Sequence, residues 1–282
     1  MSTFICGRFT LDLSRPLVMG ILNVTPDSFS DGGRFNRLDA AVARAETMLA
    51  EGAAILDIGG ESTRPNAPAV SPQEEIDRVL PVLERLVALN VPLSLDTRRA
   101  AVMKAALDLG VVDLINDVSA LEDDGALPLA VASQAGICLM HKQGNPDTMQ
   151  QKPVYQDVVA EVGDYLARRV ALCLEQGIAR ERLLGDPGFG FGKTLEHNLA
   201  LLARLPEVEQ RCGVPQLVGM SRKSMLGAIT GEPTPVERLG ASVAAALEAA
   251  RRGAKVIRVH DVKATHQALQ VLEAVSLAET QA

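Results

Sequence analysis

Short apolar runs recur along the chain and are separated by longer amphipathic stretches. The runs are too short for helices, and their apolar residues follow one another directly, as in strands that are buried on both faces of a parallel sheet. The pattern predicts eight such strands, at residues 17–23, 53–61, 92–96, 111–117, 137–141, 182–186, 216–221 and 255–260.

Helical patterns occupy the stretches between these strands. The clearest is 71–89, where Ser71 and Glu74 form a capping box around Pro72 at the first helical position. The same device, Thr-Pro-Val-Glu, opens the stretch 234–252. Further helices are expected at about 37–51, 99–109, 125–135, 154–176, 195–204 and 262–279. Glycine follows five helices, which favours left-handed C-caps at Gly52, Gly110, Gly136, Gly177 and Gly253.

The alternation of strands and helices fits either a (β/α)8 barrel or an open doubly wound sheet. The chain has 282 residues, near the roughly 250 that are typical of the barrel, and no linker or change of composition divides it. We therefore favour an α/β fold of the (β/α)8 TIM barrel type, a single domain over residues 1–282, with the open sheet as the alternative. The stretch FICGRFTLDL at 4–13 predicts a short N-terminal β-hairpin that closes the bottom of the barrel.

Composition and charge exclude several classes of function. The chain is 47% hydrophobic and carries a formal net charge of −7, whereas nucleic-acid and anionic membrane surfaces need clustered Lys and Arg. We expect no nucleic-acid partner and no membrane partner, because no run approaches the roughly 18 apolar residues of a membrane span. The four cysteines are far apart and form no C-x-x-C pair. This favours a reducing compartment and a cytoplasmic protein.

Every predicted strand ends in polar residues. In a barrel these ends lie on one rim, the C-terminal face where such folds hold their active sites. A single Asp or Asn after a strand is more often a helix N-cap than a ligand, but the complete set predicts a polar cup. Its members are Asn23, Glu61 with Thr63 just beyond it, Asp96, Asn116 with Asp117, His141, Asp186, Ser221 and His260.

Two kinds of polar group separate within this cup. The acceptors suit a ligand rich in N–H donors, such as an amino-oxo-pyrimidine edge, and they are Asp96, Asn116 and Asp186. The cations follow the seventh and eighth strands, where barrels commonly bind phosphate, and they are Arg222, Lys223, Arg258 and His260. Alternatively, Arg222 or Arg258 covers barrel surface or pairs with a nearby acid.

The stretch LLGDPGFGFGKT at 183–194 resembles two nucleotide-binding motifs and satisfies neither. The Walker A pattern requires glycine where Pro187 stands, and the dinucleotide fingerprint requires glycine where Lys193 stands. We therefore interpret Asp186 as a strand-end ligand, and the glycines as residues that let the chain turn tightly enough for Phe191 to reach the substrate.

Stretches along nearly the whole chain together resemble the dihydropteroate synthase family of the folate pathway. They are MGILNVTPDSFSDGG (19–33), DIGGESTRP (57–65), SLDT (94–97), IND (115–117), LMHKQGNPDTMQ (139–150), LLGDPGFGFGK (183–193), VGMSRKS (218–224) and IRVHDV (257–262). Single members such as SLDT carry no information, whereas the eight in family order are highly specific.

The resemblance implies a transferase on a (β/α)8 barrel that joins 6-hydroxymethyl-7,8-dihydropterin diphosphate to p-aminobenzoate and releases diphosphate. It also implies Mg2+ as a cofactor, a homodimer and a target of sulfonamides. The small-molecule substrates are then the partners. Diphosphate departure leaves a pterin methylene cation that the arylamine attacks, and we expect no general base because a neutral aniline nitrogen is already nucleophilic.

Carried over residue by residue, the resemblance assigns four groups of site residues. The pterin binders are Asp96, Asn116, Asp186 and Lys223. The diphosphate binders are Asn23, Arg64, Arg258 and His260, with Asn23 also touching Mg2+. The p-aminobenzoate binders are Thr63, Pro65, Phe29, Phe191 and Ser221, with the substrate carboxylate near a helix that starts at Ser221. The catalytic residues are Arg258, His260, Lys223 and Asp31.

Three positions depart from the family pattern. Arg98-Arg99-Ala100 replaces a small or Lys residue and a proline, which puts the start of the third helix in question. Gly185 replaces a bulky aliphatic residue, and we expect it to loosen the sixth strand. The stretch GVVDLIND is one residue longer than usual, which leaves the register of Asn116 open.

Two other functions remain as alternatives. The pterin domain of a corrinoid methyltransferase shares the barrel and the acidic pterin readers, but it needs no cations for a diphosphate. A protein that only binds or sequesters pterin would keep the three acceptors without needing Asn23, Arg64, Arg258 and His260.

Overall fold

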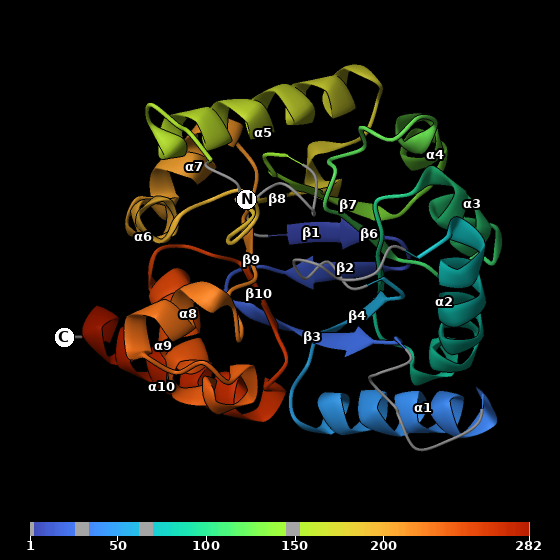
Figure 1. Cartoon of the computed structure of the whole chain (residues 1–282), viewed down its shortest axis with the longest axis horizontal. Coiled ribbons are helices and arrows are strands. Elements are labelled where there is room, and N and C mark those ends of the chain that lie inside the picture. Colours follow the sequence, from blue (N-terminus) through green and yellow to red (C-terminus); the bar gives the residue numbers. More distant parts are fainter. Residues whose placement is uncertain (1–2, 26–33, 62–69, 145–152, 282) are drawn as a thin grey trace.

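A computed structural model describes residues 3–25, 34–61, 70–144 and 153–281. A parallel sheet lies at the centre and helices surround it (Figure 1). The strand order in the eight-stranded sheet is β8-β7-β6-β5-β4-β3-β10-β9, and a bridge between Gly185 and Gln216 joins its two edges. A sheet in which chain neighbours pair throughout and the edges meet is a barrel, so the (β/α)8 prediction is confirmed and the open sheet is wrong.

The strands coincide with the predicted apolar runs; β3 has the predicted bounds, β7 is displaced by one residue toward the N-terminus, and the others are shorter than predicted. The hairpin strands are β1 (Thr3–Cys6) and β2 (Phe9–Asp12). The barrel strands are β3 (Leu17–Asn23), β4 (Ile55–Gly59), β5 (Leu93–Asp96), β6 (Leu114–Asp117), β7 (Gly136–Met140), β8 (Leu183–Asp186), β9 (Leu217–Val218) and β10 (Val256–Val259).

Helices follow each barrel strand and cover the outside of the sheet. They are α1 (Arg34–Ala50), α2 (Pro72–Leu86), α3 (Ala100–Asp108), α4 (Ala126–Ala132), α5 (Val158–Glu175), α6 (Leu195–Ala203), α7 (Leu205–Cys212), α8 (Ser224–Thr230), α9 (Leu239–Arg251) and α10 (Val262–Gln281). Short 3-10 turns lie at η2 (Val87–Leu89), η3 (Arg180–Arg182) and η4 (Pro235–Glu237). No helix within the described ranges combines the length and apolar character needed to cross a membrane.

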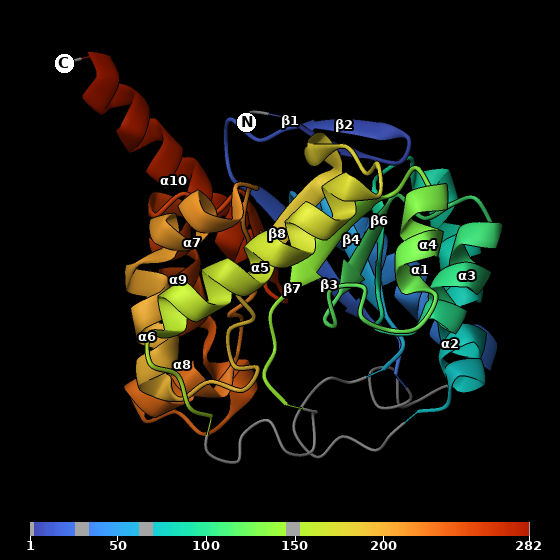
Figure 2. The same ribbon diagram turned by 90° about the horizontal axis from the view of Figure 1, so that it is seen from above.

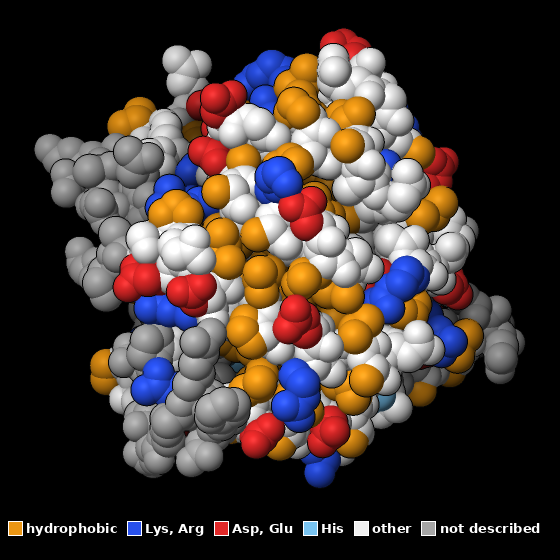
Figure 3. All heavy atoms as spheres, turned by 90° about the vertical axis from the view of Figure 1, so that its right-hand side faces the viewer, with side chains coloured by type: hydrophobic (Ala, Val, Ile, Leu, Met, Phe, Trp, Pro, Cys, Tyr) orange, Lys and Arg blue, Asp and Glu red, His pale blue; other side chains and the backbone are white. Residues whose placement is uncertain are grey.

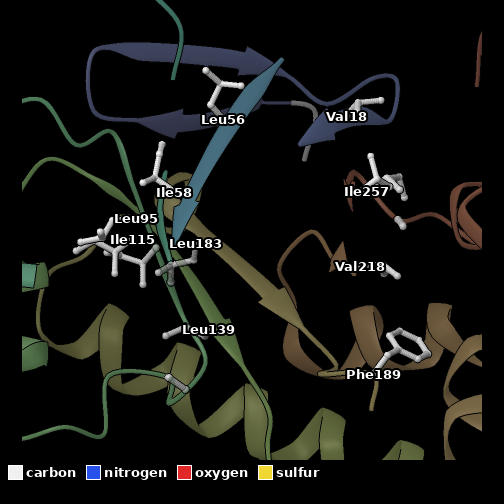
Figure 4. Packing of buried hydrophobic residues seen from close by; sticks show 14 of the residues in the cluster. Val18, Leu56, Ile58, Leu95, Ile115, Leu139, Leu183, Phe189, Val218 and Ile257 are labelled. Carbon is white, nitrogen blue, oxygen red and sulfur yellow. The ribbon is translucent and has the colours of Figure 1, made fainter. Parts of the chain in front are cut away.

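The main hydrophobic core lies between the sheet and the helices. Each strand contributes alternate residues to it, because side chains of a strand point to opposite faces. Leu56 and Ile58 of β4, Leu95 of β5 and Ile257 of β10 belong to this layer (Figure 4). The intervening residues of the same strands face the barrel interior, and there the site is built.

The hairpin closes the bottom of the barrel, as predicted. β1 and β2 lie across one end of the sheet (Figure 2), and Phe4 and Cys6 pack in a second buried cluster with interior residues such as Met19 and Leu114. Arg8 fixes the hairpin through its Nη2 atom, which donates to Asp113 Oδ2 at 2.8 Å. The opposite end of the barrel is therefore the one available to ligands.

Several local predictions differ from the structure. Ser71 and Glu74 form the expected capping box, but residues 235–237 form a 3-10 turn without a side-chain cap and α9 begins only at Leu239. The sequence also missed α7, which follows α6 directly.

One of the five proposed glycine caps is also wrong. Gly52, Gly110, Gly177 and Gly253 have positive φ, as left-handed C-caps require. Gly136 instead starts β7, where a Cβ would lie 2.5 Å from the Phe4 ring. Glycine is needed there because the hairpin packs directly on the strand.

Gly185 closes the barrel rather than loosening a strand. Its amide donates to Pro215 O at 3.0 Å, and a Cβ at this position would lie 2.9 Å from Gln216 Nε2. The buried Gln216 side chain donates to Val214 O at 2.8 Å. The space beside Gly185 is thus occupied by the side-chain amide of Gln216, the residue before β9.

Candidate active site at the carboxyl ends of the strands

A buried group of polar side chains spans the barrel interior, toward the carboxyl ends of the strands. Arg258 on β10 donates from Nε to Asp57 Oδ2 at 2.6 Å and from Nη2 to Asp96 Oδ2 at 2.6 Å. Because β3 and β4 lie between β10 and β5 in the sheet, the guanidinium crosses the interior to reach Asp96. Arg258 thus joins the eighth barrel strand to Asp57 in the middle of β4 and to Asp96 at the end of β5.

Asp57 is the centre of this group, and sequence reasoning missed it. Its carboxylate is fully buried and accepts from Ser94 Oγ at 2.5 Å and from Asn116 Nδ2 at 3.3 and 3.4 Å. The prediction considered only strand ends, whereas Asp57 stands in the middle of β4. A usable signal was present, because a carboxylate inside a strand buried on both faces requires polar partners from neighbouring strands.

Burial and neighbouring charges act against one another on the pKa values of this group. Burial raises the pKa of Asp96, and the nearby Arg258 guanidinium opposes this rise. Burial alone would lower the pKa of Arg258, but Asp57 and Asp96 outweigh it and raise that pKa. Asn116 holds its amide against Asp57, so carboxylate oxygens and an amide face the same space.

Asp186 and Lys223 form the second part of the site. Asp186 ends β8, and its Oδ1 accepts from the Gly188 amide at 2.7 Å. Lys223 donates to Phe189 O at 2.5 Å, and its Nζ lies 4.7 Å from the centre of the Phe191 ring. Burial raises the pKa of Asp186 while Lys223 opposes the rise. Burial lowers the pKa of Lys223 to about 8, and Asp186 limits the fall.

Ser221 and His260 bring the seventh and eighth strands together. Ser221 Oγ lies 3.0 Å from His260 Nδ1, and the His260 amide donates to Ser221 Oγ at 3.2 Å. Asn23 ends β3 beside this pair, because β3 and β10 are neighbours in the sheet. A Cβ on Gly59 would lie 3.8 Å from Asn23 Oδ1 and 3.6 Å from Asp96 Oδ2, so glycine keeps space open between these oxygens.

Other strand-end residues have structural roles. Asp117 accepts from the amides of Ser119 and Leu121, each at 2.7 Å, and so shapes a local turn. Arg222 pairs with Asp261, with Nε 3.0 Å from Oδ2. Pairing with a nearby acid is therefore correct for Arg222, whereas the acids that Arg258 contacts belong to the site itself.

The helix predicted at Ser221 begins later. α8 starts at Ser224, and Lys223 occupies the N-cap position without a side-chain cap. Arg222 has φ of 61° and its amide donates to Ser242 Oγ at 3.0 Å, so the chain turns here before the helix. The prediction of a helix N-terminus at Ser221 is therefore wrong, because the turn precedes the helix and α8 begins only at Ser224.

Comparison with known proteins identifies the family. A family model described as "Pterin binding enzyme" matches residues 19–260. The dihydropteroate synthase of Neisseria meningitidis serogroup B is 56% identical over 275 residues, which cover 96% of each chain. The chain belongs to the dihydropteroate synthase family.

Solved structures of dihydropteroate synthases have the same fold. The Burkholderia cenocepacia enzyme, complexed with 7,8-dihydropteroate, is 51% identical, with a TM-score of 0.91 and coverage of 100% of this chain and 99% of that one. The Xanthomonas albilineans enzyme with 4-aminobenzoic acid is 50% identical, with a TM-score of 0.91 and coverage of 98% of both chains.

Two departures from the dihydropteroate synthase pattern are now explained. α3 begins at Ala100, and Arg99 donates to Glu61 Oε1 and to Val70 O, each at 2.7 Å, instead of capping the helix. Asn116 pairs in register with Asp96 and Cys138, so the longer stretch before it does not displace it from the acceptor group.

Five of the predicted dihydropteroate synthase site residues lie outside the described residues, namely Phe29, Asp31, Thr63, Arg64 and Pro65. Among the residues that the structure describes, no three His, Cys, Asp or Glu side chains are grouped to hold a metal ion.

Proposed function

We propose that the chain condenses 6-hydroxymethyl-7,8-dihydropterin diphosphate with p-aminobenzoate, and releases 7,8-dihydropteroate and diphosphate. The observation that carries this proposal is the buried group of Asp57, Asp96, Asn116 and Arg258 beside Asp186 and Lys223. It lies at the catalytic rim of a barrel whose relatives reported above are dihydropteroate synthases at 50–56% identity. We also propose that residues 1–282 form one functional domain.

The interior acceptors would bind the pterin ring. The carboxylates of Asp96 and Asp186 would accept N–H donors of the ring, while Asn116 donates from Nδ2 to Asp57, and its amide oxygen would be the acceptor for the ligand. Lys223 supplies a cation beside Asp186. A donor-rich aminopyrimidine edge meets complementary groups in this pocket, whereas an apolar ligand would leave them unpaired.

The departing diphosphate would be stabilised at the eighth strand. Arg258 uses Nε and Nη2 for Asp57 and Asp96, which, as far as the described residues show, would leave its Nη1 atom to donate to a phosphate oxygen. His260, oriented by Ser221, and Asn23 lie on the same side, and Arg64 belongs to this group in the proposal. Fixed donors that face developing negative charge lower the barrier to bond cleavage.

Two steps complete the proposed reaction. The bond between the pterin methylene and the diphosphate oxygen breaks with both electrons going to oxygen, and the dihydropterin ring delocalises the cation. The nitrogen lone pair of p-aminobenzoate then forms the new C–N bond and the amine loses a proton. A neutral arylamine needs no general base for this attack.

We also propose Mg2+ as the cofactor, held in part by Asn23. Mg2+ in phosphate chemistry is usually bound by one or two protein oxygens together with substrate phosphates and water. Because Gly59 has no side chain, space remains beside Asn23 Oδ1, and this space fits such an arrangement. Bound there, the ion would neutralise charge on the diphosphate.

The p-aminobenzoate site is proposed at Thr63, Pro65, Phe29, Phe191 and Ser221, with Asp31 helping to hold the closed site. Of these, Phe191 lies against Lys223 and Ser221 against His260, so the described members flank the proposed pterin and diphosphate positions. A sulfonamide that mimics p-aminobenzoate would compete there, which makes the chain a proposed sulfonamide target.

We propose a homodimer in the cytoplasm. α10 extends away from the barrel (Figure 2), and Val271 and Val275 are 65% and 52% exposed on it, one turn apart. Exposed apolar residues that recur along a helix are typical of an interface.

On the face at the right of Figure 1, where α2 and α3 run, acidic and basic side chains are interspersed with hydrophobic ones (Figure 3).

Product identification tests the proposed function. The purified protein, given both substrates and Mg2+, is expected to form dihydropteroate, detected by mass spectrometry. Asp57→Asn should lower kcat/KM for the pterin substrate about 100-fold, because it removes a buried partner of Arg258 and the acceptor that orients Asn116.

The matched control is Asp164→Asn, which removes an exposed carboxylate paired with Arg211 and should leave turnover unchanged. A folded protein that binds pterin without forming dihydropteroate would favour the methyltransferase domain or the sequestering protein instead. Equal kcat/KM values for the Asp57→Asn and Asp164→Asn variants would contradict the role of the buried group.

A further inference from the structure

Lys193 is the lysine of the Gly-Lys-Thr sequence that resembles a nucleotide loop, and the proposed reaction assigns it no role. It is 3% exposed, and a charged lysine is seldom buried without partners. Its Nζ donates to Gly188 O at 2.9 Å and to Phe191 O at 3.0 Å, and lies 3.0 Å from His141 Nδ1. The hydrogens of its amino group are thus used inside the protein, where burial lowers the pKa of Lys193 to about 7 and Asp186 limits the fall.

These contacts hold the turn at residues 187–192 on the side that faces His141. Gly188, Gly190 and Gly192 all have positive φ, and a Cβ on Gly188 would lie 1.9 Å from His141 O. The turn therefore passes too close to the end of β7 for any side chain at Gly188. Lys193 joins two carbonyls of the turn to His141 in that position.

The other side of the same turn contacts Lys223. Phe189 O accepts from Lys223 Nζ at 2.5 Å, and the Phe191 ring lies 4.7 Å from that atom. The Phe189 side chain is buried in the main core (Figure 4), so the backbone at this residue is anchored. Lys193 bonds the carbonyls on either side of Phe189, at Gly188 and Phe191.

We propose that Lys193 is a positioning residue for the substrate pocket: its buried amino group fixes the 187–192 turn, and the turn fixes Lys223. This role rests on the proposed function, in which Lys223 binds the pterin ring. Without Lys193, the buried Gly188 carbonyl and the part-buried Phe191 carbonyl lose their donor and His141 Nδ1 loses its partner, and the turn relaxes toward water. Lys223 then loses the carbonyl and the ring that hold its ammonium group beside Asp186.

Lys193→Met tests this proposal, because methionine keeps most of the length and apolar bulk of the side chain. Lys223 would contact the substrate in both ground and transition states, so its displacement should raise KM more than it lowers kcat. We expect KM for the pterin diphosphate to rise about 10-fold and kcat to change less than about 3-fold. Lys104→Met, at a lysine whose side chain is 63% exposed on α3, is the control and should match the wild type.

Lys193→Gln keeps an N–H2 group and should give a smaller rise in KM, and it decides the question if Lys193→Met does not fold. A merely structural role would lower the active fraction, and with it kcat, at unchanged KM; that result in either variant overturns the proposal. Absence of dihydropteroate formation by the wild type would instead overturn the proposed function. Circular dichroism and the midpoint of thermal unfolding, measured for each variant, establish that the kinetic constants compare folded proteins.

Discussion

Lys223 is the residue whose charge state bears most directly on the site. Burial lowers its pKa to about 8 from 10.5, and Asp186 limits the fall. The ammonium form therefore dominates below pH 8 and the neutral amine above it. Between pH 8 and 10.5 an unfolded lysine still binds a proton that the folded one has released.

This shift has opposite consequences for activity and stability. We expect kcat/KM for the pterin substrate to fall as pH rises through about 8, because the neutral amine no longer balances Asp186. Because the unfolded state binds more protons in this window, the stability contributed by Lys223 should rise from pH 8 to 10.5.

Two variants isolate these effects. Lys223→Arg keeps its charge across this range and should remove the basic limb from the pH profile of whatever activity it retains. The stability difference between wild type and Lys223→Met, measured by urea unfolding at pH 8 and pH 10, should grow in favour of the wild type. A basic limb that persists in Lys223→Arg would assign the titration to another group.

At the residue scale, the sequence predicted those members of the site that end strands. Asp96, Asn116 and Asp186 stand out because a polar residue after an apolar run is visible in the pattern. Asp57 is not visible in that way, since its role depends on Ser94, Asn116 and Arg258 from three other strands. Contacts across a barrel interior depend on strand order, which no single stretch of sequence specifies.

At the element scale, the least regular part of the barrel is the join between β8 and β9. β9 has only two residues, and a single bridge between Gly185 and Gln216 links it to β8. The Gln216 amide is buried there, with Nε2 3.1 Å from Cys212 Sγ and no partner for Oε1 among the described residues. Glycine at 185 and glutamine at 216 are therefore expected to depend on one another.

A double-mutant cycle tests this dependence. Gly185→Ala places a Cβ 2.9 Å from Gln216 Nε2 and should lower the free energy of unfolding by about 1–3 kcal/mol, since the buried amide must move. In a Gln216→Ala background the same substitution should cost less than about 0.5 kcal/mol. Urea unfolding measures both, and equal costs in the two backgrounds would show that the residues are independent.

Element types were predictable from apolar periodicity, and element ends were less so. The strand at Leu17–Asn23 has the predicted bounds, because its apolar run stops at a polar residue. The cap predicted at Thr234 failed since residues 235–237 form a 3-10 turn, and Arg238 donates to Glu232 O and Arg222 O, at 2.9 Å each. Such tertiary contacts override a local capping signal.

At the scale of the whole molecule, the two ends of the barrel differ in chemistry. The hairpin and its apolar cluster close one end, while Asp57, Asp96, Asn116, Asp186 and Arg258 line the interior toward the other. The alternation of inward and outward residues along each strand produces both this polar end and the core under the helices. A ligand therefore has one end of the barrel in which to bind.

Simultaneous measurement of diphosphate release and dihydropteroate formation is the most direct test of the proposed reaction. With Mg2+ and both substrates, the wild-type protein should release one diphosphate for each dihydropteroate formed, because a single bond cleavage precedes each C–N bond. Omission of either substrate should abolish both signals. Diphosphate release in the absence of p-aminobenzoate at the full rate, or no release by folded protein, would contradict dihydropteroate synthesis at this site.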